Sequence, residues 1–194
     1  MAQTTYALSP PRRAASFAFS DNVSVLKVRR FHAASLARGL RCAWPQSPLK
    51  RLCDLVLSGG ALAVLSPLFL TVALLVRLDS AGPAFFRQER VGRDGRRFTM
   101  LKFRSMHTRA EAQRAALLAQ SDREGPCVKI RKDPRITRVG RLLRRTSLDE
   151  LPQLVNVLIG DMSLVGPRPA LPEEVAVYDA RALKRLAVRP GLTG

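Results

Sequence analysis

The apolar positions of the chain are concentrated in one uncharged segment, Leu55 to Val76. At about 1.5 Å per residue, a helix of this length just reaches across a bilayer core of about 30 Å. Ser66 and Pro67 lie at its midpoint, where a proline removes a backbone hydrogen bond and bends or breaks a helix. Basic residues flank both ends, so the charge asymmetry that orients a spanning helix is small.

These features predict a re-entrant membrane helix over residues 49–80. It would enter the bilayer, break at Ser66 and Pro67, and return, which leaves both basic flanks on the cytoplasmic face. The alternative is a buried core helix of a soluble protein. Uncharged apolar runs of 18 or more residues are usually embedded in membranes, which favours the first interpretation.

From Pro83 the pattern changes to short strands. The runs AFFRQERVG and RRFTMLKFRSM flank Asp94 and Gly95, and an Asp-Gly pair between two such runs is a strong hairpin signal. Lys102 and Arg104 are two residues apart and are therefore expected on one strand face. They could bind a diphosphate together, or they could belong to a solvated basic face.

The remaining periodicity predicts helices. Residues 107–121 have the composition of an exposed amphipathic helix. Arg138, Arg141 and Arg145 form a stripe along another helix, and a last helix starts at Pro172 and ends before Pro190. The predicted fold is α+β and mainly helical: the re-entrant helix is followed by a small cytoplasmic domain, residues 81–194, that contains the β-hairpin.

The charge of the chain is strongly positive. Lys and Arg number 33 against 15 Asp and Glu, a formal net charge of +18, which indicates an anionic partner such as nucleic acid, lipid headgroups or phosphorylated substrates. Residues 1–48 contain the single acid Asp21, and we expect a basic, flexible extension there, a transit peptide being the alternative. The cysteines and two histidines match no usual zinc pattern.

The adjacent carboxylates Asp149 and Glu150 lie in SLDELPQL, at the end of an arginine-rich stretch. Such a positive field should keep them ionised and attract phosphate. Ser147 or Asp149 can serve as N-cap, so both acids are expected at a helix N-terminus, where free N–H groups can also bind phosphate. Helix capping with salt bridges, without any catalysis, is the more common use of this pattern.

These residue types favour phosphoryl transfer. An ionised aspartate among arginines is a poor general base, but it can act as a nucleophile or a metal ligand because arginines and a divalent cation neutralise the attacked phosphate. Mg²⁺ suits a site that uses one or two carboxylates plus substrate phosphates. The loop GDMSLVGPRP presents a further cation, Arg168, between two prolines.

Several of these motifs together resemble the bacterial sugar transferases, the monotopic phosphoglycosyl transferases. They are the apolar run with its Ser-Pro pair, FFRQERVGRDGRRF, KFRSM, DPRITRVGRLLRRTSLDELPQL, GDMSLVGPRP and RPGLTG, and they cover residues 49–194. The resemblance implies transfer of a sugar 1-phosphate from a UDP-sugar to undecaprenyl phosphate, with release of UMP. This reaction is the first membrane step of exopolysaccharide, capsule, O-antigen or glycan synthesis.

The resemblance also implies roles for individual residues. Asp149 matches the family's nucleophile, which forms a covalent phosphosugar intermediate and contacts Mg²⁺, and Glu150 matches its partner. Arg168 matches a phosphate-binding arginine, while Lys102 and Arg144 match basic residues near the pair. The implied location is the bacterial inner membrane, with membrane lipids as partners, no nucleic acid, and the catalytic domain on the cytoplasmic face.

Two differences from the family pattern support alternatives. Larger members carry four spanning helices before the catalytic part, which residues 1–48 lack, and members usually continue beyond the PGLTG motif, whereas this chain stops at Gly194. A truncated, inactive relative acting as a membrane scaffold is therefore one alternative. A basic nucleic-acid-binding module is another, disfavoured by an aromatic content of only 6% and by the lack of a recognised motif. The transferred sugar and the oligomeric state are left open.

Overall fold

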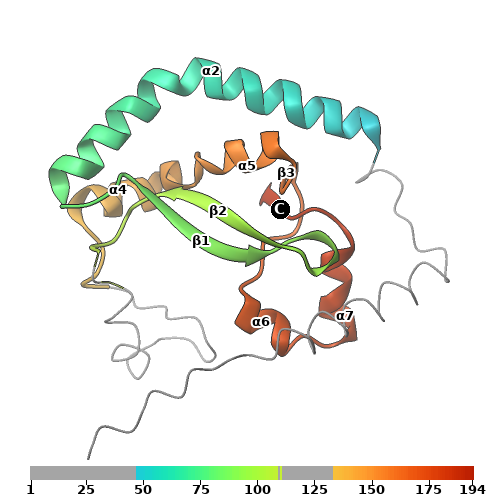
Figure 1. The fold of residues 1–194 in the computed structure, drawn as a ribbon. Coiled ribbons are helices and arrows are strands. Elements are labelled where there is room, and N and C mark those ends of the chain that lie inside the picture. The colour runs from blue at the N-terminus through green and yellow to red at the C-terminus, as the bar shows by residue number, and fades with distance from the viewer. Residues whose placement is uncertain (1–46, 109, 111–132) are drawn as a thin grey trace, which may run out of the picture.

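The computed structural model describes residues 47–108, 110 and 133–194, so the predicted N-terminal extension and most of the helix at 107–121 lie outside it. The described helices are α2 (Pro48–Asp79), α4 (Arg138–Thr146), α5 (Gln153–Ile159), α6 (Pro172–Ala176) and α7 (Ala180–Leu183), with 3₁₀ turns η2 (Arg93–Gly95), η3 (Leu148–Glu150) and η4 (Lys184–Ala187). The strands are β1 (Phe85–Val91), β2 (Arg97–Phe103), β3 (Ser163–Val165) and β4 (Gly191–Thr193). Helix α2 arches over α5 in Figure 1, with the β1–β2 hairpin on the other side of α5. The mixed α+β class with one long apolar helix is confirmed.

Helix α2 differs from the prediction because it is not interrupted at Ser66 and Pro67. Pro67 has no amide to donate to the carbonyl of Ala63, four residues earlier. The hydroxyl of Ser66 donates to that carbonyl instead, over 2.8 Å. Because a side chain replaces the missing backbone donor, the helix bends into the arch of Figure 1 and does not separate into two helices.

The middle of α2 presents apolar side chains to the outside. Val64 and Leu70 are 78% and 74% exposed, and only 11% of the most apolar 18-residue window is buried. By length and composition, α2 is the helix of the described chain that could cross a membrane. The alternative of a buried core helix is wrong, since such a helix would hide these side chains.

The N-terminal half of α2 is held by polar contacts. The Arg51 guanidinium donates to the carbonyls of Val157 and Leu158 in α5, over 2.6 and 2.9 Å. The buried carboxylate of Asp54 accepts a hydrogen bond of 2.8 Å from the Ser163 hydroxyl in β3. These contacts fix the end of α5 and the start of β3 against the helix.

The C-terminal half of α2 is held mainly by apolar packing. Val72 and Val76 are buried against Phe103 at the end of β2 and Leu143 of α4. The two halves of α2 therefore rest on the same body, while the bend between them projects away from it, as Figure 1 shows.

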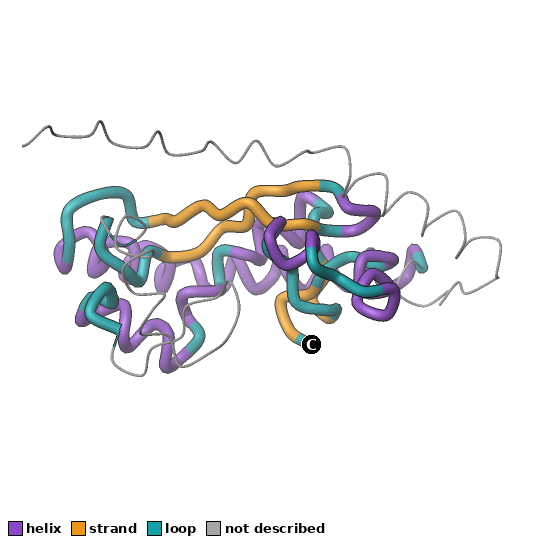
Figure 2. Tube along the Cα trace, turned by 90° about the horizontal axis from the view of Figure 1, so that it is seen from below, coloured by secondary structure: helices purple, strands orange, loops and turns teal. Residues whose placement is uncertain are grey.

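The predicted hairpin is confirmed. Strands β1 and β2 are antiparallel over seven pairs, from Phe85 opposite Phe103 to Val91 opposite Arg97. Asp94 has φ 60° in the turn, a left-handed conformation that Asp tolerates better than most residues. Figure 2 shows the hairpin running along the length of the molecule, while β3 and β4 form a separate parallel pair.

The predicted last helix starts at Pro172, as expected, but is divided into α6, α7 and η4. In a straight helix, Val175 and Leu183 would lie about 12 Å apart along the axis. Asp179 instead begins a second helix by accepting from the amide of Ala182 over 2.7 Å. The break lets Val175 and Leu183 join one buried cluster with Val91 of the hairpin.

The segment before α4 is fixed by a buried ion pair. The Arg135 guanidinium donates to both carboxylate oxygens of Asp133, over 2.9 and 2.7 Å, and both residues are buried. Gly140 in α4 crosses the backbone of Ser105 so closely that a Cβ would lie 2.1 Å from the Ser105 carbonyl oxygen. These contacts fix the segment before α4 and hold α4 close to the backbone of Ser105, just after the hairpin.

We expect Asp133→Asn to lower the free energy of unfolding by about 1–3 kcal/mol at pH 7, because a buried charge-assisted pair is lost. The hydrogen bonds from Arg135 hold the pKa of Asp133 below its usual value. A depressed carboxyl pKa gives stability that is present above the unfolded pKa of about 3.9 and is lost as pH falls through the folded pKa. The difference between wild type and variant should therefore shrink below about pH 4, as measured by unfolding in detergent.

The exposed Glu89→Gln should change stability by less than about 0.5 kcal/mol. A stability difference between wild type and Asp133→Asn that does not vary with pH would refute the linkage.

Candidate active site

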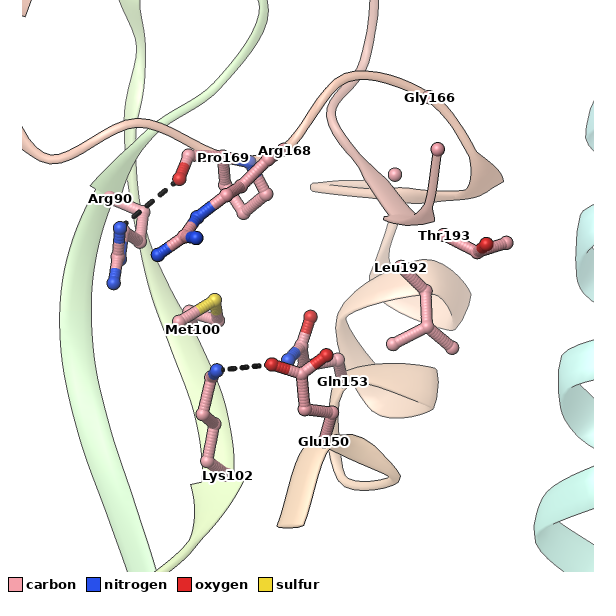
Figure 3. Close-up of a pocket in the computed structure, with 12 residues that line it drawn as sticks. Arg90, Met100, Lys102, Glu150, Gln153, Gly166, Arg168, Pro169, Leu192 and Thr193 are labelled. Carbon is pink, nitrogen blue, oxygen red and sulfur yellow. Dashed lines mark hydrogen bonds and ion pairs between the residues drawn. The ribbon is translucent and has the colours of Figure 1, made fainter. Parts of the chain in front are cut away.

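A cavity of about 360 Å³ lies where the hairpin, the η3–α5 segment and the loop after β3 meet. Figure 3 shows side chains from all of these elements around it. Its lining combines cations, one carboxylate, one amide, apolar groups and glycine-rich backbone. The lining residues are Arg90, Met100, Lys102, Glu150, Gln153, Gly166, Arg168, Pro169, Gly191, Leu192, Thr193 and Gly194.

An ion pair at the cavity wall joins the hairpin to the η3–α5 segment. The Lys102 ammonium lies 2.6 Å from a carboxylate oxygen of Glu150. Both side chains are partly exposed, at 22% and 39%, so the pair borders the cavity and is not sealed beneath it. An anion that enters the cavity therefore meets a positioned ammonium.

Asp149 adjoins the cavity without being one of its lining residues. Its side chain is buried, and burial raises its pKa; Glu150 raises it further, while Lys102 and Arg144 lower it. Burial and the Glu150 charge together outweigh the attraction of the two cations, so the positive field predicted from the sequence is present but is opposed by desolvation. A more basic carboxylate is also a stronger nucleophile once ionised.

The predicted position of both acids at the start of a helical segment after Ser147 is confirmed, but the predicted capping hydrogen bond is absent. Ser147 has φ 57° and ends α4 in a left-handed conformation, and its side chain makes no capping hydrogen bond. Asp149 and Glu150 lie in the 3₁₀ turn η3, and the α-helical hydrogen bonds begin only at α5. The sharp reversal at Ser147 is what turns both acids toward the end of α4 and the hairpin.

The predicted pair Lys102 and Arg104 is separated by the structure. Strand β2 ends at Phe103, and Arg104 is buried under α2, where it donates to the carbonyls of Val76 and Ser80 over 3.2 and 2.6 Å. It holds the C-terminal end of α2 and does not line the cavity. Of the two basic residues, only Lys102 lines the cavity.

Arg144 is placed near Asp149, as predicted. Its guanidinium Nε donates to the Ser105 hydroxyl over 2.9 Å, and its charge lowers the pKa of Asp149. Lys102 acts on the same carboxyl from β2. Lys102 and Arg144 thus come from separate elements. A local sequence pattern therefore cannot show that both act on the Asp149 carboxyl.

The loop that carries Arg168 has a fixed backbone and a free side chain. The Pro167 carbonyl accepts from the Gly191 amide over 2.9 Å, and the Ala170 carbonyl accepts from the Val91 amide over 2.9 Å. The side chain of Arg168 is exposed and makes no hydrogen bond with the described part of the chain. A rigid backbone that presents an uncommitted guanidinium is suited to bidentate binding of phosphate.

Two further residues position the site and were missed by the sequence analysis. Arg90, buried beside the cavity, donates to the Pro169 carbonyl over 3.1 Å. Asn156 of α5 accepts from the Leu101 amide over 3.0 Å and donates to the Thr99 carbonyl over 2.7 Å. Both residues contact segments that are far away in the sequence. Only the position of Asn156 on the inward-facing side of α5 could have been read from a local sequence pattern.

We expect Arg90→Leu to loosen the Arg168 loop, because the Pro169 carbonyl loses its donor. The measurement is amide hydrogen exchange, which should accelerate at residues 166–170 while the β1–β2 pairs stay protected. Arg87→Leu, an exposed change on the same strand, is the matched control and should leave the loop unchanged. Equal exchange in both variants would show that Arg90 does not restrain the loop.

Comparison with known proteins identifies the family of the chain. A family profile described as bacterial sugar transferase matches residues 45–194. The chain is 47% identical over 148 residues to the UDP-glucose:undecaprenyl-phosphate glucose-1-phosphate transferase of Caulobacter vibrioides, covering 75% of this chain and 51% of that protein. It is 41% identical over 153 residues to the exopolysaccharide production protein ExoY of Rhizobium meliloti, covering 75% and 66%.

A third relative, the undecaprenyl-phosphate galactose phosphotransferase of Salmonella typhimurium, is 42% identical over 184 residues, covering 92% of this chain and 36% of that protein. The chain thus spans between 36% and 66% of the length of these three relatives. The resemblance predicted from the motifs is confirmed, and the chain belongs to the bacterial sugar transferase family.

Proposed function

We propose that this protein transfers a sugar 1-phosphate from a UDP-sugar to undecaprenyl phosphate. The observation that carries the proposal is that Lys102 and Arg144 both act on the Asp149 carboxyl, while Lys102 also pairs with Glu150 at a cavity that presents Arg168. The names of the relatives support undecaprenyl phosphate as acceptor and glucose or galactose 1-phosphate as the transferred group.

The reaction proceeds in two displacements at one phosphorus atom. A carboxylate oxygen of Asp149 attacks the phosphorus that bears the sugar, and the bond to the bridging oxygen breaks, so UMP leaves with that oxygen. A phosphate oxygen of undecaprenyl phosphate then attacks the same phosphorus. The bond to Asp149 breaks, which restores the carboxylate and yields the undecaprenyl diphosphate sugar.

The surrounding residues neutralise charge during both steps. Arg168 binds phosphate oxygens bidentately, and its fixed backbone avoids the cost of ordering a loop. Lys102 bonds Glu150 at the cavity and also acts on the Asp149 carboxyl, so a phosphate that draws Lys102 away from Glu150 remains next to the nucleophile. Glu150 holds Lys102 in place before the substrate binds.

Mg²⁺ fits these residues as a substrate-borne ion. The described residues contain no cluster of three His, Cys, Asp or Glu side chains that would hold it alone. Mg²⁺ is usually bound by one or two carboxylates plus substrate phosphates, and Asp149 supplies one such carboxylate. When bound, the ion would neutralise negative charge on the diphosphate.

Asp149→Asn should abolish UMP release, because an amide oxygen is a far weaker nucleophile than a carboxylate. UMP is measured from UDP-glucose and UDP-galactose with undecaprenyl phosphate, with and without EDTA to remove Mg²⁺. Omitting the acceptor should leave wild type, but not Asp149→Asn, carrying labelled sugar phosphate. Asp179→Asn, an exposed helix cap where Asn serves equally well, is the control and should keep full activity.

Wild-type UMP release by Asp149→Asn would refute the nucleophile assignment. If wild type released no UMP from any donor, the membrane scaffold without activity would be the better interpretation.

The same proposal includes a re-entrant topology at the bacterial inner membrane, with the domain on the cytoplasmic face. Its support is that both halves of α2 pack on one body while the exposed apolar bend projects away from it. A straight spanning helix would carry one of these halves across the bilayer. The bend at Ser66 and Pro67 replaces the complete break predicted from the sequence.

Single cysteines at Leu49 and Arg87, in a background without the native cysteines, should both react with an impermeant maleimide from the cytoplasmic side only. Both positions are exposed in the structure. A cysteine at Val64 should react slowly from either side because the bilayer covers it. Labelling of the first two positions from opposite sides would show that α2 spans the membrane.

A further inference from the structure

Gln153 is a buried polar residue whose side chain has no partner in the described part of the chain. It is the first residue of α5 and is 3% exposed, yet its amide makes no hydrogen bond with any described residue. Its amide atoms are not fully buried, and because Gln153 lines the cavity they open onto it. The donor and acceptor of this amide are therefore available to whatever occupies the cavity.

The position of Gln153 relative to the two acids identifies the part of the substrate it meets. It follows Glu150 by three residues, about one helical turn, and both side chains line the cavity, while Asp149 directly precedes Glu150. Gln153 and Glu150 both line the cavity, and Figure 3 draws their side chains in the same part of it. A group touched by Gln153 therefore lies within one helical turn of the carboxylates.

We propose that Gln153 binds a hydroxyl group of the donor's sugar and contributes to donor specificity; this rests on the proposed function. The sugar is bonded directly to the phosphate that Asp149 attacks, whereas the uracil lies beyond a second phosphate and a ribose. A hydroxyl both donates and accepts, which matches the NH₂ and carbonyl of an amide. The phosphates are matched instead by Lys102 and Arg168.

The rest of the cavity near Gln153 suits a pyranose ring. Met100, which is 2% exposed, and Leu192 supply apolar surface for its carbon face. Gly166 and Gly191 form the opposite wall with closely packed backbone, because a Cβ at Gly191 would lie 2.1 Å from the Gly166 amide nitrogen. Apolar walls with one oriented polar group are typical of small-molecule sites.

The test compares the sugar-bearing donor with a nucleotide that lacks the sugar. The kcat/KM for UMP release is measured with UDP-glucose and UDP-galactose, and UDP is used as an inhibitor in the same assay. Gln153→Leu should lower kcat/KM for the better donor by roughly tenfold, because one substrate hydrogen bond is lost, and should reduce the preference between the two donors. The inhibition constant of UDP should stay within about twofold of wild type.

Two controls separate contact from fold. Gln153→Met keeps the side-chain volume and should reproduce the loss seen with Gln153→Leu, with an unchanged melting temperature. Asp179→Asn, an exposed helix cap that does not line the cavity, should leave the donor preference unchanged.

The outcomes separate the inference from the proposed function. If wild type releases UMP but both Gln153 variants keep its kcat/KM and donor preference, Gln153 does not bind the sugar. If UDP inhibition weakens as much as donor use, Gln153 binds the nucleotide or acts on the fold, and the inference is overturned. If wild type releases no UMP from either donor, the proposed function itself fails, and this inference fails with it.

Discussion

The site depends on the docking of α5 against one edge of strand β2. Asn156 makes this contact with its side-chain amide, which accepts from the Leu101 amide and donates to the Thr99 carbonyl, as a neighbouring strand would. The hairpin thereby gains an edge partner at one point without a third strand. The same contact sets the distance between Lys102, one residue after Leu101, and Glu150, six residues before Asn156. A two-stranded hairpin has little stability alone, so this docking determines where its lysine lies.

The acids in this site have different environments, and the difference comes from burial. Asp149 is buried and its pKa is raised, whereas Glu150 is partly exposed and bonded to Lys102. Counting charges along the chain predicts the sign of the field but not how much water is removed from each carboxyl. Because the chain reverses at Ser147, Asp149 is buried while Glu150 lies at the cavity. The two acids can therefore have different chemical roles.

Local patterns in the sequence predict the elements well. The apolar run, the Asp-Gly hairpin and the helix start at Pro172 are all present, since each depends on neighbouring residues. Some local details differ, since α2 is not broken at Ser66 and Pro67 and the last helix is divided. The wrong pairing of two basic residues has another cause, because the partner of one of them lies elsewhere in the chain. Arg104 was paired with Lys102 by strand spacing, but the strand ends between them and α2 takes the guanidinium. Gln153 and Arg90 were missed because their positions at the cavity follow from tertiary contacts.

The contacts of α2 suggest how membrane binding and the site are linked. Asp54 and Arg51, near the start of this helix, hold β3 and the end of α5. Strand β3 leads directly into the loop that presents Arg168, and α5 begins with Gln153 beside the acids. In the proposed re-entrant topology a bilayer covers the apolar bend, whereas the two halves of α2 support the walls of the cavity. The orientation of the helix in the membrane would then also fix the orientation of the cavity toward the lipid-borne acceptor of the proposed reaction.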